Sequence, residues 1–69
     1  MTVADLIEEL KQYDPQLKVI VAKDAEGNDF SPADETDQGF YLAETTWAGS
    51  YTEVGDVGSI PAIFIWPLN

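Results

Sequence analysis

Apolar residues recur with helical spacing near the start of the chain, at Val3, Leu6, Ile7, Leu10 and Tyr13. Positions three and four apart lie on one face of an α-helix, so this spacing predicts an amphipathic helix over residues 3–13. Thr2 and Asp5 have the spacing of a capping box, with Asp in place of the usual Glu, which places the helix start after Thr2. We expect the helix to stop near Asp14, because the proline that follows disfavours helical geometry at the residue before it.

After the helix, the apolar pattern changes to the alternation that is typical of β-strands. Residues 17–23, LKVIVAK, have one wholly apolar face and predict a central strand. Residues 24–28 contain a glycine and an asparagine that favour a turn. Residues 30–32 are expected to form a short extended piece that ends at a Ser-Pro pair.

Further strands are indicated in the second half of the chain. Residues 39–46 are rich in aromatic and β-branched residues and predict one strand, and a short strand is expected around residues 51–54. Residues 60–66 are apolar on both faces and predict the last strand. A strand of this kind must be buried on both faces or lie against another molecule.

These elements predict an α+β fold in which one N-terminal amphipathic helix packs on a small, mainly antiparallel sheet of three to four strands. Residues 1–69 are expected to form a single domain, because a chain of this length supports only one modest core. We expect residues 17–23 and 60–66, the two most apolar strands, to be neighbours at the sheet centre. A compact domain of this length has a radius of gyration of about 11 Å.

Negative charge is the most one-sided feature of the composition. The net charge is −10, of which residues 1–23, with all three lysines, contribute −1 and the rest of the chain contributes −9. Within residues 33–38, ADETDQ, closely spaced acids repel one another, which predicts an exposed loop. Such a surplus repels nucleic acid and anionic lipid, attracts basic partners and also aids solubility.

Several classes of function are not expected. The chain contains no cysteine and no histidine, so it has no disulfide and no thiolate or imidazole ligand or catalyst. A domain this small leaves little room for a substrate pocket, and we expect no enzyme, no cofactor and no metal site. Asp34, Thr36 and Gln38 have the spacing of EF-hand calcium ligands, but Thr45 stands where the bidentate Glu is needed. No stretch approaches the length of a membrane helix, and we expect a cytoplasmic protein.

The acidic surface leads to the principal functional hypothesis, which is DNA mimicry. A folded body with rows of carboxylates can occupy the Arg- and Lys-rich groove of a nucleic-acid-binding protein and compete with DNA. The chain itself is not expected to bind nucleic acid, since it has few lysines and no arginine. The residues expected to contact the basic partner are the carboxylates after Lys23, namely Asp24, Glu26, Asp29, Asp34, Glu35, Asp37, Glu44, Glu53 and Asp56.

A second hypothesis is a protein interaction or assembly module in which the acidity serves only solubility. Trp47 and Tyr51 are candidate aromatic anchors, because Trp and Tyr are common hot spots of protein interfaces, whereas Trp66 is expected to belong to the core. An open strand edge offers another route to a partner or to a second copy. We therefore expect a monomer or a small homo-oligomer.

The opening segment TVADLIEELKQYDPQLKVIVAKDAEGNDFSP resembles a group of small proteins encoded by bacteriophages and prophages. Shared features are a helix of the form T-V-x-x-L-I-x-x-L, an Asp-Pro turn, a Val-rich strand and an acidic glycine turn, and the ending AIFIWP is similar to their apolar last strand. The resemblance covers residues 2–32 and 60–67 and carries no site residues. It implies a phage setting, where anti-CRISPR and anti-restriction proteins include DNA mimics that help the phage evade host defence.

Overall fold

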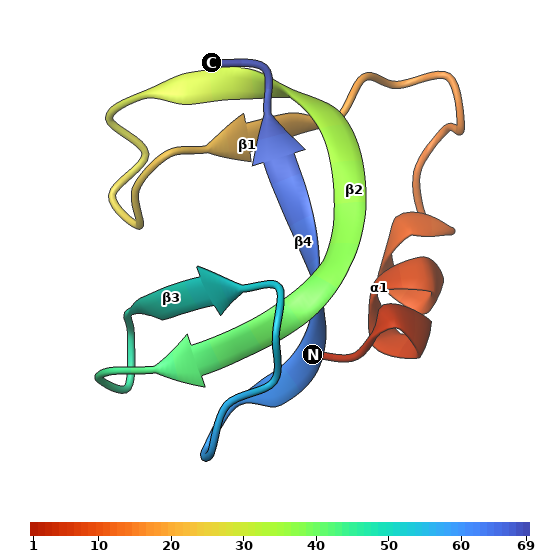
Figure 1. Ribbon diagram of the computed structural model, residues 1–69. Helices are drawn as coiled ribbons and strands as arrows, with labels where there is room; N and C mark the ends of the chain where they lie inside the picture. Colours follow the sequence, from red (N-terminus) through yellow and green to blue (C-terminus); the bar gives the residue numbers. More distant parts are fainter.

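The computed structural model describes residues 1–69 and contains one helix and four strands (Figure 1). Helix α1 spans Val3–Leu10, and the strands are β1 (Ile20–Ala22), β2 (Phe30–Ala43), β3 (Gly49–Thr52) and β4 (Ile60–Pro67). All strand pairs are antiparallel. The predicted α+β class, with one N-terminal helix and a small antiparallel sheet, is confirmed.

Helix α1 begins at the predicted capping box. The Asp5 N–H donates to the Thr2 hydroxyl oxygen at 3.1 Å, and the Thr2 N–H donates to the Asp5 carboxylate at 2.9 Å. The hydrogen bond from the Thr2 backbone N–H to the carboxylate, and after it the contribution of the Thr2 hydroxyl, hold the pKa of Asp5 below its ordinary value. The helix ends earlier than predicted, because the Tyr13 N–H bonds to the carbonyl of Leu10, three residues back, in a tighter turn.

Strand β2 is the centre of the sheet and pairs with all three other strands. Phe40 and Tyr41 pair with β3 and β4 at once, so these two strands lie on opposite edges of β2. The Ala33 N–H donates to Val19 on the β1 side, while the Pro32 carbonyl in the same peptide unit accepts from Leu68, beyond β4. The two groups of a trans peptide point in opposite directions, so β1 and β4 lie on opposite edges of β2. Because β3 also lies opposite β4, strands β1 and β3 share one edge. Strands β1 and β3 thus lie at the two ends of the β2 arc (Figure 1).

The prediction of a loop over residues 33–38 is wrong, because this acidic run lies inside β2. Strand β4 pairs with it without a break from Glu35, opposite Trp66, to Tyr41, opposite Ile60, with an irregularity next to Ala33. Acidic residues have low β-propensity, but a continuous partner strand that satisfies the backbone outweighs such local preferences. The mutual repulsion of the acids is also reduced, since they remain exposed to water.

The prediction for residues 17–23 is partly wrong. Only Ile20–Ala22 are paired, and their one partner is β2, from Ala22 opposite Phe30 to Ile20 opposite Pro32. Strand β1 is therefore short and peripheral, and it does not neighbour β4. The central strand is β2. Hydrophobicity alone does not predict this, because the middle of β2 is acidic.

The sheet encloses no buried apolar core, and only Ser31 and Gly39 are buried. Phe40 and Leu42 are among the half-buried apolar side chains and lie where the β3–β4 connection crosses β2 near Gly55 and Gly58. The molecule measures 40 × 27 × 20 Å and has a radius of gyration of 13.5 Å, larger than the compact value predicted from its length.

Strand β4 is not buried on both faces, contrary to the first of the two alternatives predicted for it. Ile63 and Ile65 are 44% and 41% exposed on the face that lies toward α1. Phe64 and Trp66 alternate with them on the other face. The second alternative predicted for this strand was contact with another molecule.

The capping box gives a pH-dependent prediction. The pKa of Asp5 is lower than its ordinary 3.8, so the stabilisation by its carboxylate is present above that value and lost as the pH falls through the lowered pKa. With Asp5→Asn, the free energy of unfolding should fall less as the pH is lowered, because this carboxylate is no longer there to be protonated. Thr2→Ala should lower the free energy of unfolding by about 1 kcal/mol at neutral pH. Urea unfolding over a pH series measures both effects. Glu9→Gln, which removes a carboxylate of the same helix outside the cap, is the control, and an Asp5→Asn profile that matches wild type would contradict the prediction.

Candidate functional site

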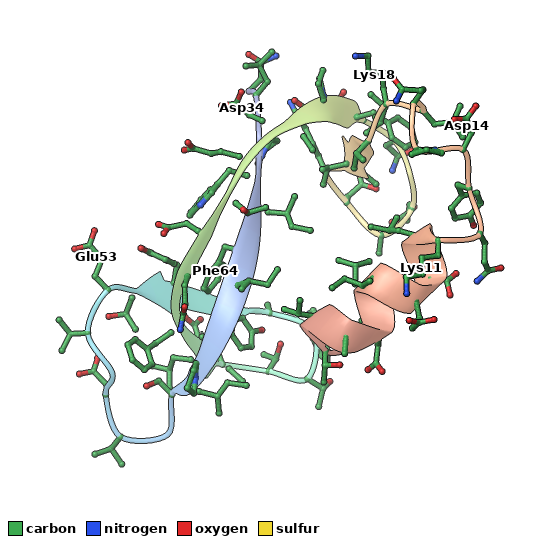
Figure 2. All side chains as sticks on the ribbon, turned by 90° about the vertical axis from the view of Figure 1, so that its right-hand side faces the viewer. Lys11, Asp14, Lys18, Asp34, Glu53 and Phe64 are labelled. Carbon is green, nitrogen blue, oxygen red and sulfur yellow. The ribbon has the colours of Figure 1, made fainter.

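All thirteen carboxylates of the chain are exposed. Two are paired with a lysine, Glu8 with Lys11 at 2.9 Å and Asp29 with Lys23 at 3.6 Å, which leaves eleven without a cationic partner. Figure 2 shows Lys11 and Lys18 on the side of α1 and Glu53 on the opposite side of the molecule. The charge is therefore divided in space as it is in sequence, with a nearly neutral helix side and a strongly negative sheet side.

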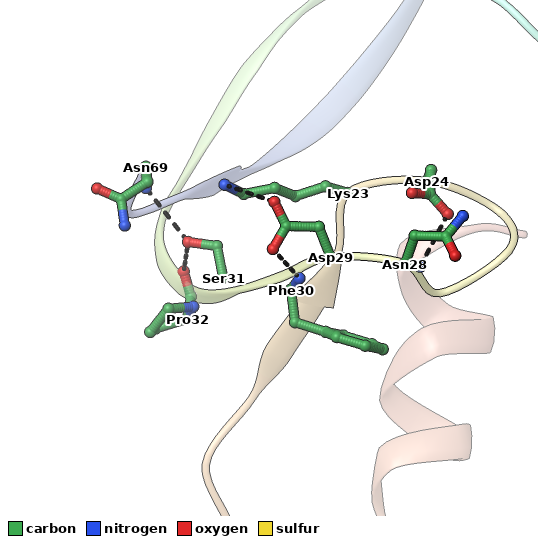
Figure 3. Close-up of polar contacts among 8 residues, drawn as sticks. All are labelled: Lys23, Asp24, Asn28, Asp29, Phe30, Ser31, Pro32 and Asn69. Atoms are coloured by element: carbon green, nitrogen blue, oxygen red, sulfur yellow. Dashed lines mark hydrogen bonds and ion pairs between the residues drawn. The ribbon is translucent and has the colours of Figure 1, made fainter.

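The β1–β2 turn uses two of its predicted partner-binding acids for its own conformation (Figure 3). The Asp24 carboxylate accepts the N–H groups of Glu26 and Asn28 at 2.8 and 3.2 Å, and Gly27 provides the positive φ of 73° that the turn requires. Asp29 accepts the Phe30 N–H at 2.9 Å besides pairing with Lys23. Glu26 alone projects from this turn without a side-chain partner.

The acids of β2 lie along a strand edge that has no neighbour. On the edge that carries β1 and β3, paired residues end at Pro32 and resume at Phe40, so Asp34, Glu35 and Asp37 fall in the uncovered interval. Uncovered edges tend to recruit further strands, and charged side chains oppose such pairing. The acidic run therefore has a structural role in addition to any binding role, because it keeps the exposed middle of β2 from pairing edge to edge.

An aromatic cluster occupies the face of the sheet away from α1. Tyr51 of β3 makes edge-to-face contacts with Phe64 at 4.8 Å and with Trp66 at 5.5 Å between ring centroids, and Phe64 and Trp66 stack at 6.1 Å. The Tyr51 ring reaches across β2 because Gly39 has no side chain there, and a Cβ at Gly39 would lie 2.5 Å from Cε2 of Tyr51. Gly39 is thus what allows rings from the two outer strands to meet.

Carboxylates border this cluster. Glu35 lies opposite Trp66 and Asp37 lies opposite Phe64 across the β2–β4 pair, so their side chains share the face of the rings. We call Glu35, Asp37, Tyr51, Phe64 and Trp66 the aromatic–acidic surface. Its chemistry suits a guanidinium or ammonium group, which can lie over a ring face while a carboxylate accepts its N–H groups.

Tyr51 links the rings to the acids. Its hydroxyl donates to Asp37 Oδ2 at 3.4 Å. Partial burial raises the pKa of Tyr51 above its ordinary value, and the charges of Asp37 and Glu53 raise it further. The hydroxyl therefore remains a neutral hydrogen-bond donor throughout the physiological pH range.

The remaining predicted site residues lie apart from this surface. Glu44 accepts a hydrogen bond from the Ser50 hydroxyl near the β2–β3 turn, and Asp56 lies in the β3–β4 connection, where its carbonyl accepts from Ser59. Trp47 is 84% exposed in the β2–β3 turn and makes no ring contact with Tyr51. The two predicted aromatic anchors therefore do not form one site.

The sequence did not predict that Phe64 and Trp66 lie next to the acids of β2. Trp66 was expected in the core, yet it is 37% exposed and lies among the rings of the aromatic–acidic surface. The i, i+2 spacing of Phe64 and Trp66 was a usable signal, since it places both rings on one face of a strand. Their neighbours could not be identified while residues 33–38 were predicted to form a loop.

Comparisons with protein-family models, with curated proteins and with solved structures find no match for this chain. No group of three acidic side chains is arranged as a metal site would require. The single helix is neither long enough nor apolar enough to cross a membrane.

The ionisation of Tyr51 tests the geometry of the aromatic–acidic surface. Its pKa is raised above 10.0, so the stabilisation linked to the neutral ring is present below that value and lost as the pH rises through the raised pKa. Ultraviolet difference titration against Tyr51→Phe isolates this tyrosine from Tyr13 and Tyr41. Asp37→Asn should lower the pKa of Tyr51, while the control Glu26→Gln, in the β1–β2 turn, should leave it unchanged. Equal effects of both variants would show that only net charge matters.

A double-mutant cycle tests the contact between Gly39 and Tyr51. Gly39→Ala should destabilise the fold by about 1 to 3 kcal/mol, because the new Cβ overlaps the ring. In a Tyr51→Ala background, the same change should be neutral or stabilising, since alanine loses less backbone entropy than glycine in a strand. Urea unfolding of the four proteins gives the coupling energy, and additive effects would contradict the contact.

Proposed function

We propose that this protein is a non-enzymatic inhibitor that binds a basic, nucleic-acid-handling protein complex and blocks the path of its DNA. The observation that carries the proposal is the display of eleven exposed carboxylates without a cationic partner on a folded body, mostly on the sheet side. Unneutralised surface charge of this kind raises the rate of encounter with a positively charged groove and disfavours other partners.

The dimensions support mimicry of a duplex. The longest axis of the chain is 40 Å. Duplex DNA of that length presents about 24 phosphates at one per 1.7 Å, of which about half face a protein on one side. The net charge of −10 is therefore similar to that of the duplex face that it would replace.

The aromatic–acidic surface adds a specific mode of contact. An arginine that normally pairs with a phosphate could pair with Glu35 or Asp37 while its guanidinium plane lies on Trp66. Aromatic contacts of this kind are less sensitive to salt than charge pairs alone. We propose that the carboxylates in the turns attract the partner and that this surface holds it.

The resemblance to phage and prophage proteins supplies the biological setting of the proposal. In that setting the target would be a host defence complex that handles nucleic acid, and the inhibitor would act in the cytoplasm of the host cell. The chemistry required of the target is an Arg- and Lys-lined groove that accepts DNA.

A second candidate function is a protein interaction or assembly module. The specific observation in its favour is Trp47, which is 84% exposed at the tip of the β2–β3 turn. A tryptophan this exposed is a typical anchor for an apolar pocket of a partner. In this alternative the acids serve solubility and protect the β2 edge.

A charge-matched pair of variants tests DNA mimicry. One variant carries Asp34→Asn, Glu35→Gln and Asp37→Asn, and the control carries Glu8→Gln, Glu9→Gln and Asp14→Asn on the helix side. Both lose three negative charges, so a difference between them reflects position. We expect the first variant to bind at least about tenfold more weakly at low salt and the control to bind almost as well as wild type.

The readout is capture from a host lysate at low and high salt, followed by a DNA-binding assay of what is retained. Wild type should retain a basic complex, inhibit its binding to labelled duplex DNA and lose affinity steeply as salt rises. Binding that does not depend on salt would contradict mimicry. A larger loss for Trp47→Ala than for the triple variant would favour the second candidate.

A further inference from the structure

The apolar face of α1 is only partly covered within the chain. Val3, Ile7 and Leu10 lie on one side of the helix and are 51%, 50% and 47% exposed. An eight-residue helix is too short to be stable in water on its own propensity, so it depends on packing of its apolar face. No residue of α1 is fully buried, and even Leu6, which lies beside β4, is only half-buried, so the chain itself packs this helix incompletely.

Two hollows flank this helix face. One, of about 530 Å³, opens between the first turn of α1 and β4 and is lined by Val3, Leu6, Ile63 and Ile65 among others. The other, of about 370 Å³, lies beyond the last turn and is lined by Leu10, Tyr13, Leu17 and Ile20 among others. Figure 2 shows α1 standing apart from the strands on this side. We call α1 together with these two hollows the helix face.

The accessible surface of the whole chain indicates how much cover is missing. The chain exposes 5867 Å². A compact monomer of 7.6 kDa exposes about 4,300 Å², so the excess is about 1,600 Å². Two chains that each covered this excess would bury about 3,200 Å² in total, which lies within the range of obligate homodimers.

The distribution of charge favours a second copy on the helix face and opposes it elsewhere. Residues 1–23 have a net charge of −1 and contain all three lysines, so two helix faces can approach without strong repulsion. Contact between two sheet sides would instead bring together two surfaces that each have a net charge of −9, and they would repel each other. Pairing through the free edge of β2 would align Asp34, Glu35 and Asp37 with their own copies.

We infer that two copies of this chain form a symmetric dimer in which the α1 helices and the adjoining faces of β4 pack against each other. Ile7, Leu10 and Ile63 of each copy enter the hollows beside α1 of the other, and the acidic sheet sides face outward. A symmetric pairing of one self-complementary surface is the commonest form of protein oligomer. The dimer does not depend on what the acidic sheet side binds.

Sedimentation equilibrium of the full chain tests the dimer, with two matched variants. Ile7→Lys places a charge in the centre of the helix face, and Val57→Lys makes the same change at a fully exposed apolar residue of the β3–β4 connection. Wild type and Val57→Lys should have twice the chain mass at micromolar concentration, whereas Ile7→Lys should be monomeric or unfolded. If Val57→Lys dissociated the dimer as much as Ile7→Lys does, the assignment of the dimer contact to the helix face would be overturned.

Thermal unfolding of wild type at a series of concentrations keeps the test decisive if Ile7→Lys does not fold. A dimer that unfolds to separate chains should gain about 3 to 6 °C in Tm for each tenfold rise in concentration. A monomeric mass with a Tm that does not change with concentration would overturn the inference. Wild type that stays monomeric and becomes protected on the helix face only when another protein binds would assign that face to a different partner.

Discussion

The structure depends on the antiparallel pairing of β2 with β4. This pairing extends the acidic run of β2 into a strand, and it brings Glu35 and Asp37 opposite Trp66 and Phe64. It also fixes which face each residue of β4 occupies, so the rings lie with Tyr51 while Ile63 and Ile65 lie toward α1. A shift of register by one residue would turn Phe64 and Trp66 toward α1 and Ile63 and Ile65 toward Tyr51, so the ring cluster would be lost.

The same pairing explains why the chain is open. Strand β2 uses one edge for β4 and shares the other between two short strands, so the sheet is a bent ribbon that cannot close around a core. The single helix lies beside this ribbon and leaves its own apolar face about half exposed. A monomer of this shape obtains little stabilisation from burial, and the proposed pairing of two helix faces would add to it.

Local signals in the sequence predicted what local interactions determine. The capping box at Thr2 and Asp5, the turn at Gly27 and the apolar strand predicted over residues 60–66 follow from neighbours in the chain, and each is present. The strand character of residues 33–38 depends on a partner about thirty residues away, and nothing in ADETDQ itself records that partner. The cluster of Tyr51, Phe64 and Trp66 was missed for the same reason, since its geometry follows from the register of β2 with both neighbours and from the small size of Gly39.

The two contacts proposed for the helix face and the sheet side should respond to salt in opposite directions, which separates their roles physically. Two chains of charge −10 repel each other over the distance between their sheet sides, and added salt screens that repulsion, so apolar pairing through α1 becomes more favourable. Binding of a basic groove by the carboxylates becomes weaker under the same conditions. Low salt should therefore strengthen the proposed acidic contact and weaken the proposed dimer, and high salt should do the reverse. If the two surfaces are independent, the dimer should still bind the basic groove, whereas one shared surface would make the two contacts mutually exclusive.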